Sequence, residues 1–149
     1  MGNNTGRPMP TATKKPLTEA QLQAAPAKDY MNEEQLAFFR QRLLDLKREL
    51  LENVRDTSEH LRETEAASDP SDRATQEEEQ AIELRTRDRE RKLLKKIEEA
   101  LARIDDATYG FCNETGEPIG VRRLLARPTA TLTIEAQERR ERMQRMFGD

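Results

Sequence analysis

The sequence is poor in the residues that build a thick core or a metal site. Its 149 residues include one cysteine, one histidine and no tryptophan, and only 34% are hydrophobic. A single cysteine excludes an intramolecular disulfide and suits a reducing compartment. Too few apolar residues are present to bury the whole chain in one core. We therefore expect a small globular part with an extended, solvent-exposed part.

Basic residues are not in surplus either. The chain has 26 Lys and Arg against 29 Asp and Glu, a formal net charge of −3. A non-specific DNA-binding protein needs excess positive charge to displace counterions, so direct DNA binding is disfavoured. No apolar run reaches the roughly 18 residues of a membrane helix, and the N-terminus lacks the apolar region of a signal peptide. We expect a cytoplasmic protein.

The features of an enzyme are also missing. The sequence shows no nucleophile paired with a base, no glycine-rich phosphate loop and no cluster of metal ligands. We therefore expect no catalytic residues. With 37% charged residues the chain could even be disordered, and only a periodic apolar pattern distinguishes a long helix from a disordered segment.

Such a pattern is present in two long segments. Asn32 can cap the first helix with Gln35 in the reciprocal position. The apolar residues that follow at spacings of three and four are Leu36, Phe39, Leu43, Leu46 and Leu50. The second segment places on one face Leu93, Ile97, Ala100 or Leu101, and Ile104. Between the segments, Asp69 and Pro70 are typical of a helix stop followed by a helix start.

The predicted fold is all-α, a long antiparallel two-helix coiled-coil hairpin on a small globular base. Its parts are a flexible N-terminal tail at 1–31 with a short helix packing on the base, and the hairpin at 32–107 with its tip near 64–74. Residues 108–149 form the globular base, with a degenerate zinc knuckle and a C-terminal helix. Thr18 is expected to cap the short helix with Gln21 in the reciprocal position. The C-terminal helix is expected to cover the base with Ile134, Met143 and Met146.

Charge is distributed unevenly along the hairpin. The acidic residues that dominate its distal part are Asp56, Glu59, Glu63, Glu65, Asp69, Asp72, Glu77, Glu78 and Glu79. An acidic tip can be steered into a positively lined cleft, although most of these residues individually fit a solvated helix face with local ion pairs. Nearer the base, Arg89 and Lys96 flank Leu93 on one stripe. If Arg127 folds back onto it, three cations converge and suit a multiply phosphorylated small molecule.

Three long motifs carry a resemblance to a known family. They are YMNEEQLAFFRQRLLDLKREL, DPSDRATQEEEQAIELRTRDRERKLLKKIEEAL and IGVRRLLARPTATL, which follow one another from Tyr30 to the start of the C-terminal helix. Together they resemble the DksA family of bacterial transcription factors. The resemblance implies a regulator that binds RNA polymerase, core or holoenzyme, inserts its coiled coil through the secondary channel, and modulates initiation together with the alarmone ppGpp in the stringent response.

The resemblance also implies which residues act. The family's tip motif, which lies near the polymerase active site, falls on Asp69, Asp72, Arg73 and Ala74. Its ppGpp contacts, made at the interface with polymerase, fall on Arg89, Leu93, Lys96 and Arg127. One lysine of the family is replaced by Gln137, with Arg139 and Arg140 nearby.

The four zinc-binding cysteines of the family are not all present. Their positions are occupied by Cys112, Thr115, Thr133 and Ala136. One thiolate cannot build a tetrahedral zinc site, so the chain resembles the single-cysteine, zinc-independent members. We expect no metal and no stably bound cofactor, and Cys112 as a small semi-buried hydrophobe. The residues expected to hold this degenerate knuckle by packing are Tyr109, Phe111, Ile119, Leu124 and Leu132.

Two alternatives stay open at this stage. The protein could be a secondary-channel factor that stimulates transcript cleavage through metal-holding tip carboxylates, or a structural coiled-coil module with no polymerase partner. A monomer is expected in each case.

Overall fold

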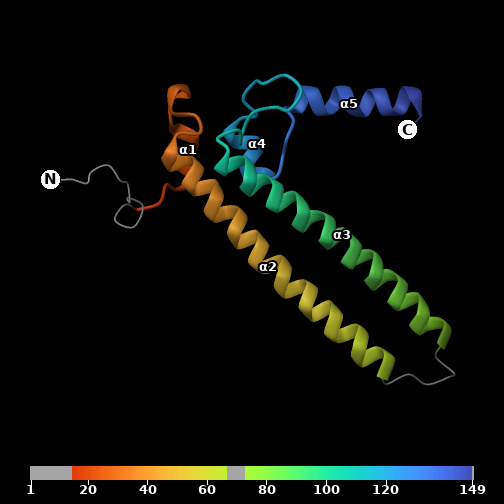
Figure 1. The fold of residues 1–149 in the computed structure, drawn as a ribbon. Coiled ribbons are helices and arrows are strands. Elements are labelled where there is room, and N and C mark those ends of the chain that lie inside the picture. Colours follow the sequence, from red (N-terminus) through yellow and green to blue (C-terminus); the bar gives the residue numbers. More distant parts are fainter. Residues whose placement is uncertain (1–14, 67–72, 149) are drawn as a thin grey trace. The chain divides into compact units, whose positions relative to one another are not determined.

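A computed structural model describes residues 15–66 and 73–148 (Figure 1). Its helices are α1 (Glu19–Ala24), the 3₁₀ helix η2 (Ala27–Asp29), α2 (Glu33–Ala66), α3 (Arg73–Asp105), α4 (Val121–Ala126) and α5 (Ile134–Phe147). The chain divides into a hairpin unit, Leu43–Glu99, and a base unit that comprises the described residues up to Arg42 and from Ala100 onward. The predicted all-α fold is confirmed. In the described ranges, no helix combines the length and apolar character needed to cross a membrane.

The start of α2 is fixed by a cap that differs in one bond from the predicted one. Asn32 Oδ1 accepts the amide of Gln35 at 2.9 Å, which confirms Asn32 as the cap. The Gln35 side chain, however, accepts the amide of Met31 at 2.9 Å and not that of Asn32. Because the Asn32 amide already donates to the Asp29 carbonyl at the end of η2, at 2.9 Å, Gln35 bonds one residue further back. Gln35 is buried as a result, so each of these polar atoms is satisfied.

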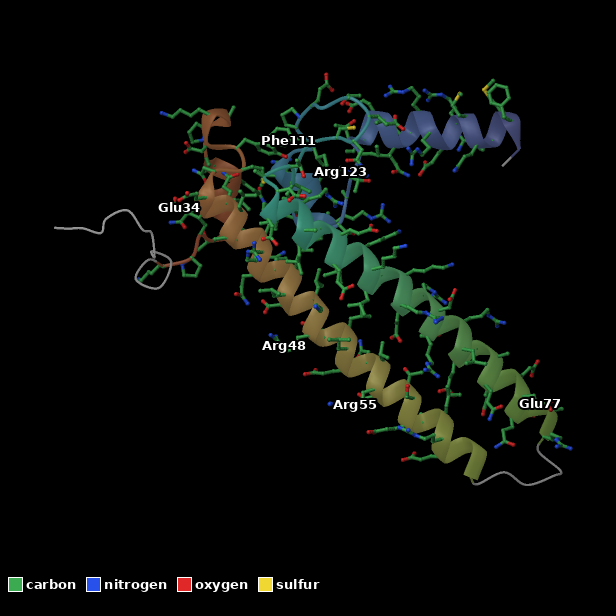
Figure 2. The ribbon with its side chains drawn as sticks, viewed as in Figure 1. Glu34, Arg48, Arg55, Glu77, Phe111 and Arg123 are labelled. Atoms are coloured by element: carbon green, nitrogen blue, oxygen red, sulfur yellow. The ribbon has the colours of Figure 1, made fainter. Side chains whose placement is uncertain are left out.

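In the hairpin unit, α2 and α3 run antiparallel. Lys47 Nζ lies 3.6 Å from Glu98 Oε2, and His60 Nδ1 lies 2.9 Å from both carboxylate oxygens of Glu83. The residue numbers of the partners on α3 therefore decrease as those on α2 increase. Charged side chains such as Arg48, Arg55 and Glu77 line the outside of the two helices (Figure 2). The buried apolar residues of this unit are Leu43, Leu50, Leu61 and Ile97.

The inward face of α3 changes from apolar to polar along its length. Half-buried residues at Gln80, Glu83, Arg87 and Glu90 continue, at spacings of three and four, the row that Ile97 begins. Glu90 Oε1 is buried with no hydrogen-bond partner in the described structure. A cavity of about 310 Å³ opens in the same stretch, lined by Ser58, Leu61, Arg62, Gln80, Leu84 and Arg87. The distal part of the hairpin therefore gains little from hydrophobic burial.

Leu93 does not belong to the apolar face, and that prediction is wrong. Its side chain is 42% exposed, whereas Leu94 is half-buried in the row with Ile97. Adjacent leucines on a helix point about 100° apart, so only one of them can continue a stripe. The stripe continues through Leu94, and Leu93 is left on the solvent side.

His60 gives the hairpin a pH-dependent cross-helix contact. The hydrogen bond to Glu83 raises the pKa of His60 most, followed by the charge of Glu83. Desolvation lowers this pKa, and the charges of Glu63 and Glu79 raise it further. Because the folded pKa is raised, the contact stabilises fully below the unfolded value of about 6.5 and is lost as pH rises through the folded value.

The expected result is a hairpin that melts at higher temperature near pH 6 than near pH 8. Replacing His60 with Gln should reduce this pH difference, as measured by helical circular dichroism during heating. Arg48→Gln is the control, because Arg48 pairs with Asp45 on the same helix at 3.1 Å and, among the described residues, makes no contact with α3 that is comparable to the one between His60 and Glu83. An unchanged difference in the His60 variant would assign the pH dependence to other groups.

The core of the base unit brings together described residues from the stretch before Arg42 and from the stretch after Ala100. Its buried side chains are Leu22, Met31, Phe39, Ala100, Ile104, Tyr109, Cys112, Ile119, Leu124, Ala130, Leu132 and Ala136. The capping box of Thr18 and Gln21 is confirmed. Helix α1 contacts α4, and Glu19 Oε2 lies 2.6 Å from Arg42 Nη2 on α2. The N-terminal segment is thus part of the base.

Helix α5 does not cover the base with its large apolar residues, contrary to the prediction. Ile134 and Met143 are both 52% exposed and Met146 is 70% exposed, while Ala136 is fully buried. Nine residues separate Ile134 from Met143, which places them on opposite sides of a helix with 3.6 residues per turn. They cannot form one stripe, so α5 is held through its first turn, where Thr133 Oγ1 accepts the amide of Ala136 at 3.2 Å.

Candidate functional site

Arg89, Leu93 and Lys96 share one exposed face of α3 in the hairpin unit. Within the residues that the structure describes, Arg89 and Lys96 have no ion-pair partner. Their neighbours differ, because Arg91 and Lys92 both pair with Asp88, at 2.9 and 3.3 Å. The two cations that flank Leu93 are therefore available to an anionic ligand, and the exposed leucine supplies an apolar contact between them.

Arg127 belongs to the base unit, directly after α4. Its backbone is fixed by two turns, since its amide donates to the Arg123 carbonyl at 2.8 Å and its carbonyl accepts the Ala130 amide at 3.0 Å. Its side chain is exposed. The predicted ppGpp residues are thus distributed over both units, with three on the hairpin and one on the base.

The residues around Gln137 are engaged within the base unit. Gln137 Nε2 donates to Glu141 Oε2 at 2.8 Å. Arg139 and Arg140 both pair with Glu114, at 3.8 and 2.9 Å. Both arginines that follow Gln137 are therefore engaged in ion pairs with the same carboxylate.

Half of the predicted tip motif lies outside the described residues, namely Asp69 and Asp72. Arg73 and Ala74 open α3 and are exposed. Arg73 Nε lies 3.9 Å from Glu77 Oε2, with both side chains more than two-thirds exposed. A pair of this kind contributes little to stability, so these residues are available for contacts with a partner.

The knuckle, residues 109–120, is a pair of short antiparallel segments joined by a turn. Its hydrogen bonds run from the Cys112 amide to the Glu117 carbonyl and from the Ile119 amide to the Gly110 carbonyl, both at 2.8 Å. Gly110 and Gly120, near its two ends, have φ of 92° and 106°, a region that favours glycine. The knuckle therefore keeps a closed backbone path.

Most of the packing predicted for the knuckle is confirmed. Tyr109, Ile119, Leu124 and Leu132 are all less than 9% exposed. Phe111 differs, since it is 36% exposed and packs its edge against Tyr30, with ring centroids 5.5 Å apart. Phe111 therefore contacts the N-terminal segment and lies at the surface of the base (Figure 2).

Side-chain hydrogen bonds to backbone atoms add to this packing, and the sequence did not reveal them. Tyr30 Oη donates to the Gly110 carbonyl at 2.7 Å and accepts the Gly120 amide at 2.9 Å. Tyr109 Oη donates to the Pro128 carbonyl at 2.7 Å, and Arg123 Nε donates to the Leu132 carbonyl at 2.9 Å. Burial raises the pKa of Tyr30, although amides at Gly120 and Ile119 act in the opposite direction, so its hydroxyl stays protonated and can donate.

The four positions of the zinc ligands come together but do not fit a zinc ion. Cys112 is buried, and Thr133 Oγ1 lies 3.9 Å from its sulfur. Ala136, which has no donor atom, follows Thr133 in the first turn of α5, and Thr115 offers only a hydroxyl. Structural zinc requires four thiolate or imidazole ligands, and the part of the chain that the structure describes has no group of three acidic, His or Cys side chains placed to hold a metal.

The sulfur of Cys112 is nevertheless in a polar environment. Burial acts to raise the pKa of this thiol, but hydrogen bonds from the Thr115 side chain and from the amides of Thr133, Thr115 and Glu114 outweigh it and lower the pKa to about 6. The predicted burial of Cys112 is confirmed, and the hydrogen bonds around its sulfur distinguish it from a plain hydrophobe.

Comparison with known proteins matches two family models to consecutive parts of the chain. Residues 35–104 match the family model of the DnaK suppressor protein DksA, N-terminal domain, and residues 107–142 match the prokaryotic dksA/traR C4-type zinc finger. An RNA polymerase-binding transcription factor DksA from Caulobacter vibrioides (strain NA1000 / CB15N) is 54% identical over 121 residues, which cover 80% of this chain and 85% of that protein. The chain belongs to the DksA family.

Other members of the DksA family are similar to this chain in sequence and in structure. The RNA polymerase-binding transcription factor DksA of Escherichia coli (strain K12) is 49% identical over 117 residues, 77% of each chain. The solved structure of transcription factor DksA2 from Pseudomonas aeruginosa is similar with a TM-score of 0.81 and 50% identity, covering 86% of this chain and 99% of that one. The chain matches a four-cysteine zinc-finger model although it has one cysteine. The DksA-type knuckle is therefore present here without the four cysteine ligands of that model.

Proposed function

We propose that this protein is a transcription regulator that binds RNA polymerase directly, acts through the secondary channel and modulates initiation together with ppGpp. The observation that carries the proposal is the identity of about half of all residues, over most of the chain, with factors named for binding RNA polymerase. The protein acts as a monomer in the cytoplasm, has no catalytic activity of its own and does not read DNA directly.

The charge of the hairpin supports entry with the tip first. Among the described residues near the tip, Glu59, Glu63, Glu77, Glu78 and Glu79 are exposed. A weakly packed, acidic end gains little in stability from its own sequence, but it is attracted by a positively lined channel. Asp69, Asp72, Arg73 and Ala74 then act next to the polymerase active site.

The binding of ppGpp is assigned to Arg89, Leu93, Lys96 and Arg127, at the interface with polymerase. Support comes from the two unpaired cations on either side of an exposed leucine on α3. Guanidinium and ammonium groups form short, charge-assisted hydrogen bonds to phosphate oxygens, and the flat guanidinium can bind two oxygens at once. Gln137 lacks the charge for a further phosphate contact.

In vitro transcription tests the proposal directly. Purified protein is added to RNA polymerase at a ribosomal promoter and at an amino-acid biosynthesis promoter, with and without ppGpp. We expect changed initiation that ppGpp strengthens, and co-purification with core polymerase. Stimulated RNA cleavage in stalled complexes would favour the cleavage-factor alternative, and the absence of binding to core polymerase would favour a structural coiled coil.

Metal removal is expected to leave the protein folded and active. A four-cysteine knuckle gains folding free energy from its metal and loses it to a chelator, whereas Cys112, Thr115, Thr133 and Ala136 supply one thiolate in total. We expect an unchanged melting temperature and unchanged transcription activity in EDTA. Cys112→Ser should cost about 1 kcal/mol. Equimolar zinc in elemental analysis, or activity lost to chelation and restored by zinc, would reveal a ligand set that these four residues do not provide.

A further inference from the structure

The sequence of the knuckle does not supply the ligands of a metal that would hold it closed. Its two segments must stay closed around a turn, and the four positions at which a metal would hold them supply one sulfur, two hydroxyls and a methyl group. The backbone bonds at Cys112 and Ile119 close the middle of the knuckle. At its open end, one backbone bond joins the Ile119 amide to the Gly110 carbonyl, and the Gly120 amide needs a partner from elsewhere in the chain.

Tyr30 provides a contact to both sides of that open end. Its hydroxyl donates to the Gly110 carbonyl at 2.7 Å and accepts the Gly120 amide at 2.9 Å. Both hydrogen-bonding roles of the hydroxyl are therefore used, one on each segment of the knuckle. Removing the hydroxyl is costly mainly on one side, because the Gly120 amide loses its partner whereas the Gly110 carbonyl keeps its bond from the Ile119 amide.

The backbone of Gly110 lies in close contact with the side chains of Tyr30 and Met31. A Cβ added to Gly110 would lie 2.8 Å from Met31 Cγ, 3.0 Å from Met31 Sδ and 3.2 Å from the Tyr30 hydroxyl. Met31 itself is buried with a φ of 55°, an uncommon conformation for a residue other than glycine. The side chains of Tyr30 and Met31 thus approach the backbone of Gly110 so closely that a Cβ at this position would displace the Met31 side chain.

Tyr30 is itself held from several directions. The Met31 amide is bound by the side chain of Gln35, and the Tyr30 amide donates to the Ala27 carbonyl at 3.1 Å. The ring packs against Phe111. The hydroxyl is therefore presented by a fixed ring and does not have to be ordered when it binds the knuckle.

Gly120 connects this contact to the arginine that follows α4. It is the residue before α4, and its carbonyl accepts the amide of Leu124 at 3.1 Å in the first turn. Helix α4 has only six residues and ends at Ala126, next to Arg127. The orientation of Gly120 therefore sets the direction of a short helix and the position of Arg127 at its end.

We propose that Tyr30 is a positioning residue. Its hydroxyl holds the knuckle closed without a metal and thereby fixes the direction of α4 and the position of Arg127. The part concerning Arg127 rests on the proposed function, whereas the closure of the knuckle does not.

The first test measures closure in the full-length protein. Tyr30→Phe keeps the ring and its contact with Phe111 but removes both hydrogen bonds. We expect amide hydrogen exchange at Gly120 and Ile119, followed by NMR, to become about tenfold faster or more, as the loss of one to two part-buried hydrogen bonds implies. The matched control is Tyr109→Phe, which removes the only other tyrosine hydroxyl and its bond to the Pro128 carbonyl. Equal exchange at Gly120 in wild type and Tyr30→Phe overturns the proposal.

The second test approaches the contact from the other side. Gly110→Ala keeps the hydroxyl but forces Tyr30 and Met31 away, and it should likewise accelerate exchange at Gly120. If that variant fails to fold, Tyr30→Phe alone decides the matter.

In transcription with polymerase, Tyr30→Phe should raise the ppGpp concentration needed for half of the effect several-fold, while the effect at saturating ppGpp is kept. Faster exchange with an unchanged ppGpp requirement would retain the closure and overturn the link to Arg127. If neither wild type nor variant responds to ppGpp, the proposed function has failed and the exchange result stands by itself.

Discussion

Replacing Asp72 with Asn and Ala74 with Thr is expected to abolish regulation of transcription while leaving polymerase binding nearly intact. Asp72 lies outside the described residues, and Ala74 is exposed in the first turn of α3. Ala74 is not among the buried apolar residues of the hairpin, and Asp72→Asn keeps the size of the side chain, so these substitutions should change stability by less than about 0.5 kcal/mol. The effect on transcription should be complete, because in the proposed mechanism the tip is the part that reaches the polymerase active site.

The measurement combines in vitro transcription with binding to core polymerase and with thermal unfolding. The matched control is Asp56→Asn with Ala81→Thr, which makes the same chemical changes at two exposed positions of the same hairpin. The control should regulate like wild type. A tip variant that also regulates like wild type would remove Asp72 and Ala74 from the active part of the molecule.

Replacing Lys96 with Ala is expected to weaken the response to ppGpp strongly while binding to polymerase is retained. Lys96 is exposed on α3 and has no ion pair within the described residues, so no internal contact is lost with it. One charge-assisted hydrogen bond to phosphate is worth about 1.5 to 3 kcal/mol when it is well desolvated, which corresponds to a factor of about 10 to 100 in ppGpp affinity.

Titrating ppGpp into transcription reactions measures this change. Lys92→Ala is the control, since Lys92 is one turn away on the same helix, carries the same charge and is paired with Asp88 at 3.3 Å. If both variants respond alike, the effect belongs to the general charge of the helix. Equal responses of the Lys96 variant and wild type would exclude Lys96 from the site.

Features encoded within a few residues were predictable from the sequence. The caps at Thr18 and Asn32 each need partners three residues away, and both are present in the structure. The long helices also followed, because an apolar period of three and four over many residues has few alternatives. Leu93 was misassigned because two leucines stand side by side and only packing against α2 decides which one turns inward.

Features that join distant parts of the chain were not predictable. Tyr30 and Gly120 are 90 residues apart, and no pattern in either neighbourhood indicates that a hydroxyl of one meets the amide of the other. The lowered pKa of Cys112 likewise depends on amides from a different segment, at Thr133. For the predicted site, the sequence and the family resemblance named the residues of α3, and the structure added which of their charges are already paired.

The base unit is assembled from two stretches of chain, one ending at Arg42 and one beginning at Ala100. During synthesis on the ribosome, Phe39 and Leu22 emerge long before Tyr109, Leu124 and Leu132, the residues with which they share a core. Contacts of such high sequence separation form only after the intervening loop has been closed, and the cost of closure grows with its length. Because α2 and α3 pair before the base forms, their pairing shortens the effective loop between the two stretches that build the base. We therefore expect the nascent chain to acquire its long helices first, and the base to become resistant to protease only after its last segment has left the exit tunnel.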